Sequence, residues 1–81
     1  MLALPQAAMN AVHPKKLLLS KWTAVQPLVR DKHFLVAKVI TPEPPAARID
    51  EVEIEAVRSR AVRRIDWREL RDDTRWRQGW L

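Results

Sequence analysis

The clearest fold signal in the sequence is the segment EVEIEAV, residues 51–57. Its apolar side chains, Val52, Ile54 and Ala56, fall on every second residue, and glutamates fill the positions before them. Successive side chains of an extended chain point to opposite faces, whereas a helix would scatter the two kinds around its circumference. The segment is therefore predicted to be a β-strand with one buried and one solvated face.

The alternation changes parity after this strand, because the next apolar residues, Ala61 and Ile65, are odd-numbered. A turn or bulge within residues 58–60 explains the change, and a further strand is predicted over residues 61–65.

Helical signals follow in the C-terminal part of the chain. Asp66 stands where a helix N-cap is expected, and Glu69 lies three residues later, as in a capping box. A short helix is predicted from Trp67 to about residue 71. Trp76 and Trp80 are four residues apart, so they would share a face if the last segment were helical.

Two more strands are expected upstream. Residues 17–25 (LLLSKWTAV) and 33–40 (HFLVAKVI) are rich in aliphatic, β-branched and aromatic side chains. Residues 41–47 (TPEPPAA) contain three prolines and are predicted to form an extended, irregular loop. Residues 1–13 show no period and are expected to be a flexible N-terminal arm, which leaves residues 14–81 as one small domain.

These elements predict a mainly β fold. A chain of 81 residues forms one domain and buries only about 60–65% of its unfolded surface. Four short strands suggest a strongly bent antiparallel sheet, or a small SH3-like or Sm-like barrel of about four strands, with a short C-terminal helical segment. The alternative is an open four-stranded sheet covered by that helical segment.

The net charge of +5 is unevenly distributed. Residues 1–42 contain six basic residues and one acidic residue, and residues 56–81 contain eight and four. Residues 43–55, between these blocks, contain one basic and five acidic residues. A polyanionic partner such as RNA is compatible with the two basic blocks.

Several kinds of chemistry lack the residues they need. The chain has no cysteine, which excludes disulfides and thiolate ligands and fits a reducing compartment such as the cytoplasm. One glycine cannot build a phosphate-binding loop, and two histidines without ligand spacing do not indicate a metal site. No apolar run approaches the length of a membrane span. We expect no enzymatic activity, no cofactor and no metal.

The C-terminal tryptophans and arginines form the one pattern that suggests binding. Trp67, Trp76 and Trp80 are interleaved with four arginines within fifteen residues, and such rings and guanidinium groups can stack on unpaired bases. The same tryptophans could instead clamp the tail onto the sheet as core residues, and Trp22, in an apolar strand, is expected in the core. Trp and Arg also dominate protein–protein hot spots.

Four blocks carry a resemblance to a known family: KKLLLSKWTAV at residues 15–25, KHFLV at 32–36, DWREL at 66–70 and RWRQGWL at 75–81. With these blocks in this order, the chain resembles a family of small tryptophan-rich bacterial proteins of unknown function. The resemblance covers residues 14–81, with residues 41–60 similar in pattern rather than identity. It implies no activity, cofactor or catalytic residue.

The sequence favours an RNA- or ribosome-associated binder that acts through a basic Arg/Trp surface. The alternative is a protein–protein adaptor, or an assembly or regulatory subunit, that uses exposed tryptophans and the glutamate face. The candidate contact residues are Lys15, Lys16, Lys21, Arg58, Arg60, Arg63, Arg64, Arg68, Arg75, Trp76, Arg77 and Trp80.

Overall fold

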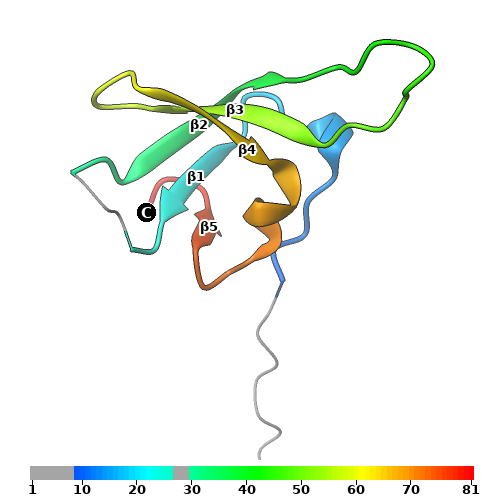
Figure 1. Ribbon diagram of the computed structural model, residues 1–81. Helices are drawn as coiled ribbons and strands as arrows, with labels where there is room; N and C mark the ends of the chain where they lie inside the picture. The colour runs from blue at the N-terminus through cyan, green and yellow to red at the C-terminus, as the bar shows by residue number, and fades with distance from the viewer. Residues whose placement is uncertain (1–8, 27–29) are drawn as a thin grey trace, which may run out of the picture.

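The central feature of the computed structural model, which describes residues 9–26 and 30–81, is one antiparallel sheet of five strands (Figure 1). The strands lie in the order β4-β3-β2-β1-β5. Two short 3-10 turns, η1 and η2, accompany them, and the predicted mainly β class is confirmed. The bounds are η1 Pro14–Lys16, β1 Lys21–Ala24, β2 His33–Val39, β3 Glu51–Ala56, β4 Val62–Asp66, η2 Trp67–Arg71 and β5 Trp76–Gln78.

The β3–β4 hairpin follows the alternation of the sequence. Val52, Ile54 and Ala56 are fully buried on the inner face of the sheet, and the glutamates of β3 lie on the outer face. The chain reverses at the predicted turn, where Arg60 has a φ of 66° and its N–H donates to the carbonyl of Ala56. The strand predicted over residues 61–65 is confirmed with a shift of one residue.

The hydrophobic core lies on the inner face and is rich in tryptophan. Trp22 is 1% exposed, and its indole N–H donates to the Ser20 hydroxyl at 2.8 Å. A buried tryptophan removes about 200 Å² from water, an upper limit of about 5 kcal/mol at about 25 cal/mol/Å². The core cluster contains Leu17, Trp22, Val36, Val52, Ile54, Ile65, Trp67, Leu70 and Trp76.

The first strand is much shorter than the predicted residues 17–25. The chain turns before it, because the Ser20 N–H donates to the Leu17 carbonyl at 2.9 Å and Leu19 adopts a φ of 65°. A strand cannot continue through this left-handed conformation, which non-glycine residues rarely adopt. Leu17 is therefore buried, while Leu18 and Leu19 are exposed.

A bulge changes the register of β2. Val36 pairs with Ile54, and the next pair along the ladder joins Glu53 to Lys38, so that Ala37 is passed over. Lys38 therefore lies on the glutamate face of the sheet, although simple alternation predicts it beside Phe34.

The last segment is a strand, so the predicted helical turn containing Trp76 and Trp80 is wrong. β5 pairs with β1, with Trp76 opposite Ala24 and Gln78 opposite Trp22. The closed barrel is also wrong, because β4 and β5 are the two edges of the sheet and do not pair with each other. η2 lies beneath the sheet between these edges, as in the open-sheet alternative with a fifth strand added (Figure 1).

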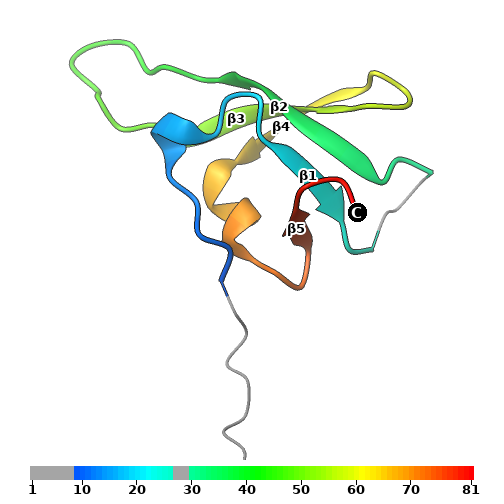
Figure 2. The same ribbon diagram turned by 180° about the vertical axis from the view of Figure 1, so that it is seen from behind.

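The segment before η1 is fastened to the C-terminal part of the chain. Of the expected flexible arm, residues 1–13, residues 1–8 lie outside the described part. Figure 2 shows the following residues running beside η2. The Asn10 N–H donates to the Arg71 carbonyl at 3.0 Å, and its side-chain amide donates to the carbonyls of Leu70 and Trp76, both at 2.8 Å.

Replacement of Asn10 is expected to destabilise the fold. Asn10→Ala removes both side-chain donors from partly buried carbonyls, which costs about 1–3 kcal/mol of unfolding free energy. Urea unfolding followed by tryptophan fluorescence measures the loss. Gln78→Ala is the control, because Gln78 donates to the Ala11 carbonyl in an exposed position. This variant should lower the free energy of unfolding by less than about 0.5 kcal/mol. Equal effects of the two variants would contradict the role of Asn10.

Candidate functional site

The four tryptophans divide into three core residues and one surface residue. Trp22, Trp67 and Trp76 are buried, whereas Trp80 is 41% exposed. Trp76 was a candidate contact residue, but its ring is 3% exposed and packs edge-on against Phe34, with ring centroids 5.2 Å apart. Among the tryptophans, only Trp80 offers a ring to a partner.

The Trp80 ring is held in place on the outer side of β1 and β2. Its indole N–H donates to the Phe34 carbonyl at 2.9 Å. The Lys21 ammonium lies 4.8 Å from the ring centroid, which is within the range of a cation–π interaction. The His33 ring is tilted against Trp80, with centroids 6.2 Å apart. A flat ring with a fixed orientation is thus combined with positive charge.

The chain around Trp80 is anchored through Thr23. The Gly79 N–H donates to the Lys21 carbonyl, and the Thr23 hydroxyl donates to the Gly79 carbonyl at 2.6 Å. That hydroxyl also accepts the Leu81 N–H at 3.0 Å. Gly79 has a φ of 84°, a conformation that glycine adopts without strain and that lets the chain turn back over β1.

Arg77 lies on the same face of the sheet. It is the cross-strand partner of Thr23, which in turn pairs with His33, so the three residues form a row across β5, β1 and β2. Directly opposite residues in an antiparallel ladder project to the same side. We call Lys21, His33, Arg77 and Trp80 the Trp80 surface.

Most arginines of the β3–β4 hairpin form ion pairs with carboxylates of the same chain. Arg60 pairs with Glu55 at 3.1 Å, and Arg64 pairs with Glu53 at 3.4 Å. Arg58 lies 3.2 Å from Oδ1 of the buried Asp31, without hydrogen-bond geometry. The other oxygen of this carboxylate, Oδ2, accepts from Ser59 at 2.8 Å.

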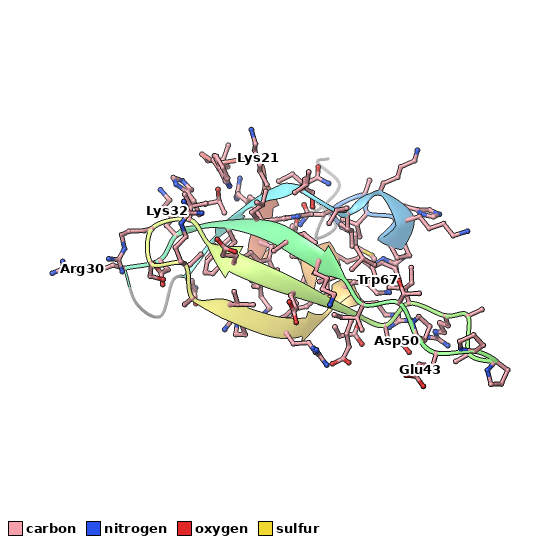
Figure 3. The ribbon with its side chains drawn as sticks, turned by 90° about the horizontal axis from the view of Figure 1, so that it is seen from above. Lys21, Arg30, Lys32, Glu43, Asp50 and Trp67 are labelled. Atoms are coloured by element: carbon pink, nitrogen blue, oxygen red, sulfur yellow. The ribbon has the colours of Figure 1, made fainter. Side chains whose placement is uncertain are left out.

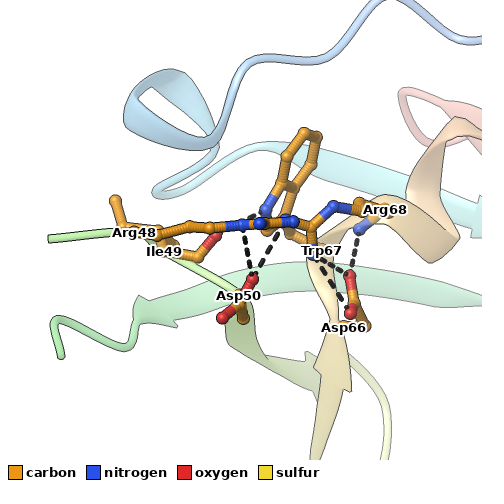
Figure 4. Close-up of polar contacts among 6 residues, drawn as sticks. All are labelled: Arg48, Ile49, Asp50, Asp66, Trp67 and Arg68. Carbon is orange, nitrogen blue, oxygen red and sulfur yellow. Dashed lines mark hydrogen bonds and ion pairs between the residues drawn. The ribbon is translucent and has the colours of Figure 1, made fainter. Parts of the chain in front are cut away.

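Arg68 also has a structural role. It hydrogen-bonds to Asp66 and Asp50 and joins the start of η2 to the loop before β3 (Figure 4). The hydrogen bond to Asp50 is the largest of the effects that raise the pKa of Arg68. In the same cluster, the Trp67 indole donates to the Ile49 carbonyl at 2.7 Å. Arg75, near β5, is paired with Glu69.

The unpaired basic residues are spread over several elements of the fold. All ten acidic residues lie in the described part of the chain, so ion pairing can be assigned for each basic residue. Six arginines are paired and nine basic residues have no carboxylate within 4.0 Å. The nine are Lys15, Lys16, Lys21, Arg30, Lys32, Lys38, Arg63, Arg71 and Arg77. Figure 3 shows Arg30 and Lys32 toward one end of the molecule, Lys21 nearer the middle, and Glu43 and Asp50 toward the other end.

The structure therefore brings only part of the predicted set together. Lys21, Arg77 and Trp80 share the Trp80 surface, whereas Lys15 and Lys16 lie apart on η1. Sequence reasoning missed His33, which is not among the candidate contact residues. His33 pairs with Thr23, which also pairs with Arg77 and lies two residues from Lys21. This placement depends on the strand register, which the residues around His33 do not predict.

The turn that leads into β5 is built on Asp72. Its Oδ1 accepts from the backbone N–H of Thr74 at 3.0 Å and from the Thr74 hydroxyl at 2.6 Å. Hydrogen bonding to Thr74 is the main reason that the pKa of Asp72 is lowered. Asp72 therefore holds the turn that leads into β5.

Comparison with known proteins identifies the family. The sequence profile described as tryptophan-rich protein (DUF2389) matches residues 20–81, from just before β1 to the end of the Trp80 surface. The chain belongs to this tryptophan-rich protein family. No curated protein and no solved structure gave a match. All four tryptophans of this family member lie within the matched region.

Residues 9–26 and 30–81 were searched for metal-binding groups and membrane-spanning helices. They contain no group of three or more histidine, cysteine or acidic side chains that could hold a metal ion. They also contain no helix that is long and apolar enough to cross a membrane.

The turn at Asp72 predicts a dependence of stability on pH. Because the pKa is lowered in the folded protein, the contribution of Asp72 is complete above about pH 4 and is lost as the pH falls through the folded value. Asp72→Asn keeps an acceptor oxygen and removes the charge. Thermal unfolding should show a lower Tm for the variant at neutral pH and a difference that shrinks below about pH 4. A difference that is constant across this range would contradict the assignment.

Proposed function

We propose that this protein binds single-stranded RNA, alone or on the ribosome, through the Trp80 surface. The observation that carries the proposal is the exposed Trp80 ring, oriented by its hydrogen bond to Phe34 and flanked by the Lys21 ammonium. Proteins that bind single strands combine such aromatic rings, on which bases stack, with cations that contact phosphates. We place this activity in the cytoplasm, because the cysteine-free composition suits a reducing compartment.

Orientation of the ring before binding supports a stacking role. A side chain that is already fixed loses little conformational freedom when a base stacks on it. The indole N–H of Trp80 already donates to Phe34, so the exposed part of the ring offers apolar aromatic surface rather than a hydrogen-bond donor. Stacking of this kind tolerates any base, so we expect weak sequence preference.

The distribution of free charge supports the same surface. Lys21 and Arg77 have no carboxylate partner, whereas three of the four arginines of the β3–β4 hairpin are paired, Arg60 with Glu55, Arg64 with Glu53 and Arg58 with Asp31. A paired guanidinium must give up its carboxylate, or share it, before it can neutralise a phosphate. We therefore assign the phosphate contacts to the β1–β5 side of the sheet and not to the hairpin.

The proposal predicts three measurable effects on binding to a fluorescein-labelled oligo(U) of about twelve nucleotides. Trp80→Ala should weaken binding by about 5- to 150-fold, because a stacked base contributes about 1–3 kcal/mol. Arg77→Gln should lower the slope of log affinity against log salt by about 0.7, the value for one released counterion on a single strand. Lys21→Gln should lower it equally. Fluorescence anisotropy over a range of KCl concentrations gives both quantities.

Arg60→Gln is the matched control. It removes the same charge from an exposed arginine that is paired with Glu55, and the salt slope should not change. Thermal unfolding of each variant is the check that the fold is retained. Absence of binding at low salt, or equal losses in Arg60→Gln and Arg77→Gln, would overturn the proposal. So would a cellular complex that resists nuclease and depends on Trp80, since this is the behaviour expected of a protein adaptor.

A further inference from the structure

The open edge of the sheet at β4 is a second surface, separate from the Trp80 surface. β4 is the terminal strand and pairs only with β3. The Ala56 N–H donates to the Ala61 carbonyl, so alternate residues from Ala61 onward direct their backbone groups toward β3. Val62 and Arg64 consequently direct their N–H and C=O groups away from the sheet, and no partner for these groups is found in the described residues.

A groove runs beside this edge on the inner face, where the sheet fails to close. Its volume is about 410 Å³, and it lies between β4 on one side and the residues around β5 on the other. Phe34 and Ala24, which are partly buried, and the exposed Ala61 offer apolar contacts. The buried Trp76 and Ala56 lie at the base of the groove.

Arg63 gives the groove its charge preference. It projects from β4 on the same face as Ile54, its cross-strand partner, and it lines the groove. Two carboxylates, Asp31 and Glu69, also line the groove, but Asp31 is paired with Arg58 and Glu69 with Arg75. Arg63 has no carboxylate within 4.0 Å. A solvated guanidinium beside an apolar groove and an open edge favours an acidic side chain on the incoming strand.

We propose that β4 binds an extended peptide segment of another protein by strand addition. The peptide backbone pairs with Val62 and Arg64, which supplies affinity without regard to sequence. The peptide residue opposite Arg63 is acidic, and a residue two positions away, on the same face, is apolar and enters the groove. The recognised pattern is therefore an acidic and an apolar residue separated by one position.

A second copy of the chain is a poor occupant of this edge. Antiparallel pairing of β4 with itself around Arg63 or Arg64 would place two guanidinium groups directly opposite each other. Like charges in opposed positions destabilise a strand pair, and charged edge residues commonly prevent such pairing. The occupant must bring the complementary charge, as an acidic peptide does.

Selection of peptides on the full-length protein tests the proposal. A display library of random heptapeptides should yield binders enriched in an acidic residue two positions from an apolar one. Selection on Arg63→Glu should replace the acidic residue by Lys or Arg. Lys15→Glu, which makes the same change in net charge on η1, should leave the preference as in the wild type. A synthetic peptide with the acidic pattern should bind Arg63→Glu about tenfold more weakly than the wild-type protein.

Hydrogen exchange locates the bound peptide. In the complex the amides of Val62 and Arg64 should exchange more slowly, and N-methylation of the peptide amides that pair with β4 should abolish binding. Trp80→Ala should bind the peptide normally, so failure here is distinguishable from failure of the RNA proposal. Absence of any selected binder, a preference unchanged by Arg63→Glu, or protection elsewhere than at β4 would overturn the proposal.

Discussion

Burial of three indole rings on one face of a short sheet is the condition on which the rest of this structure depends. Trp22, Trp67 and Trp76 supply much of the volume of the core, and they join β1, near the start of the domain, to η2 and β5, near its end. The Trp22 and Trp67 N–H groups are satisfied by Ser20 and Ile49, so these rings are buried without the loss of a hydrogen bond. Trp80 lies outside the core, because the chain turns back over β1 at Gly79.

The parts of the fold that sequence could predict are those with local, alternating or capping signals. Strand β3, the turn at Arg60 and the Asp66 cap, which accepts from the Arg68 N–H at 2.9 Å, follow directly from neighbouring residues. Strand β5 could not be predicted, because the spacing of Trp76 and Trp80 suits a helix and only pairing with β1 makes the segment extended. The left-handed Leu19 and the closing turn at Asp72 likewise depend on tertiary context.

The sequence predicts the residue types of the candidate site, tryptophan and basic residues, but not which of these residues lie together. Sequence shows many arginines near tryptophans, but it does not show which guanidinium groups face carboxylates across a ladder. The register of β3 and β4 places Glu53 opposite Arg64, while Arg60 reaches Glu55, so these two arginines are paired while Arg63 between them in sequence is not. The number of basic residues in a segment of the sequence therefore differs from the number of unpaired basic side chains on the surface of the folded protein.

The pairing of β5 with β1 also has a consequence for biosynthesis. β1 is translated early, but its second neighbour consists of residues 76–78, and Asn10 reaches its acceptor at Trp76 only when that strand has emerged. The β2–β3–β4 meander is paired without any residue of β5. Until residues 76–78 are available to pair with β1, that strand has an uncovered edge and the core lacks one of its three rings, so the nascent chain exposes surface that is prone to aggregate.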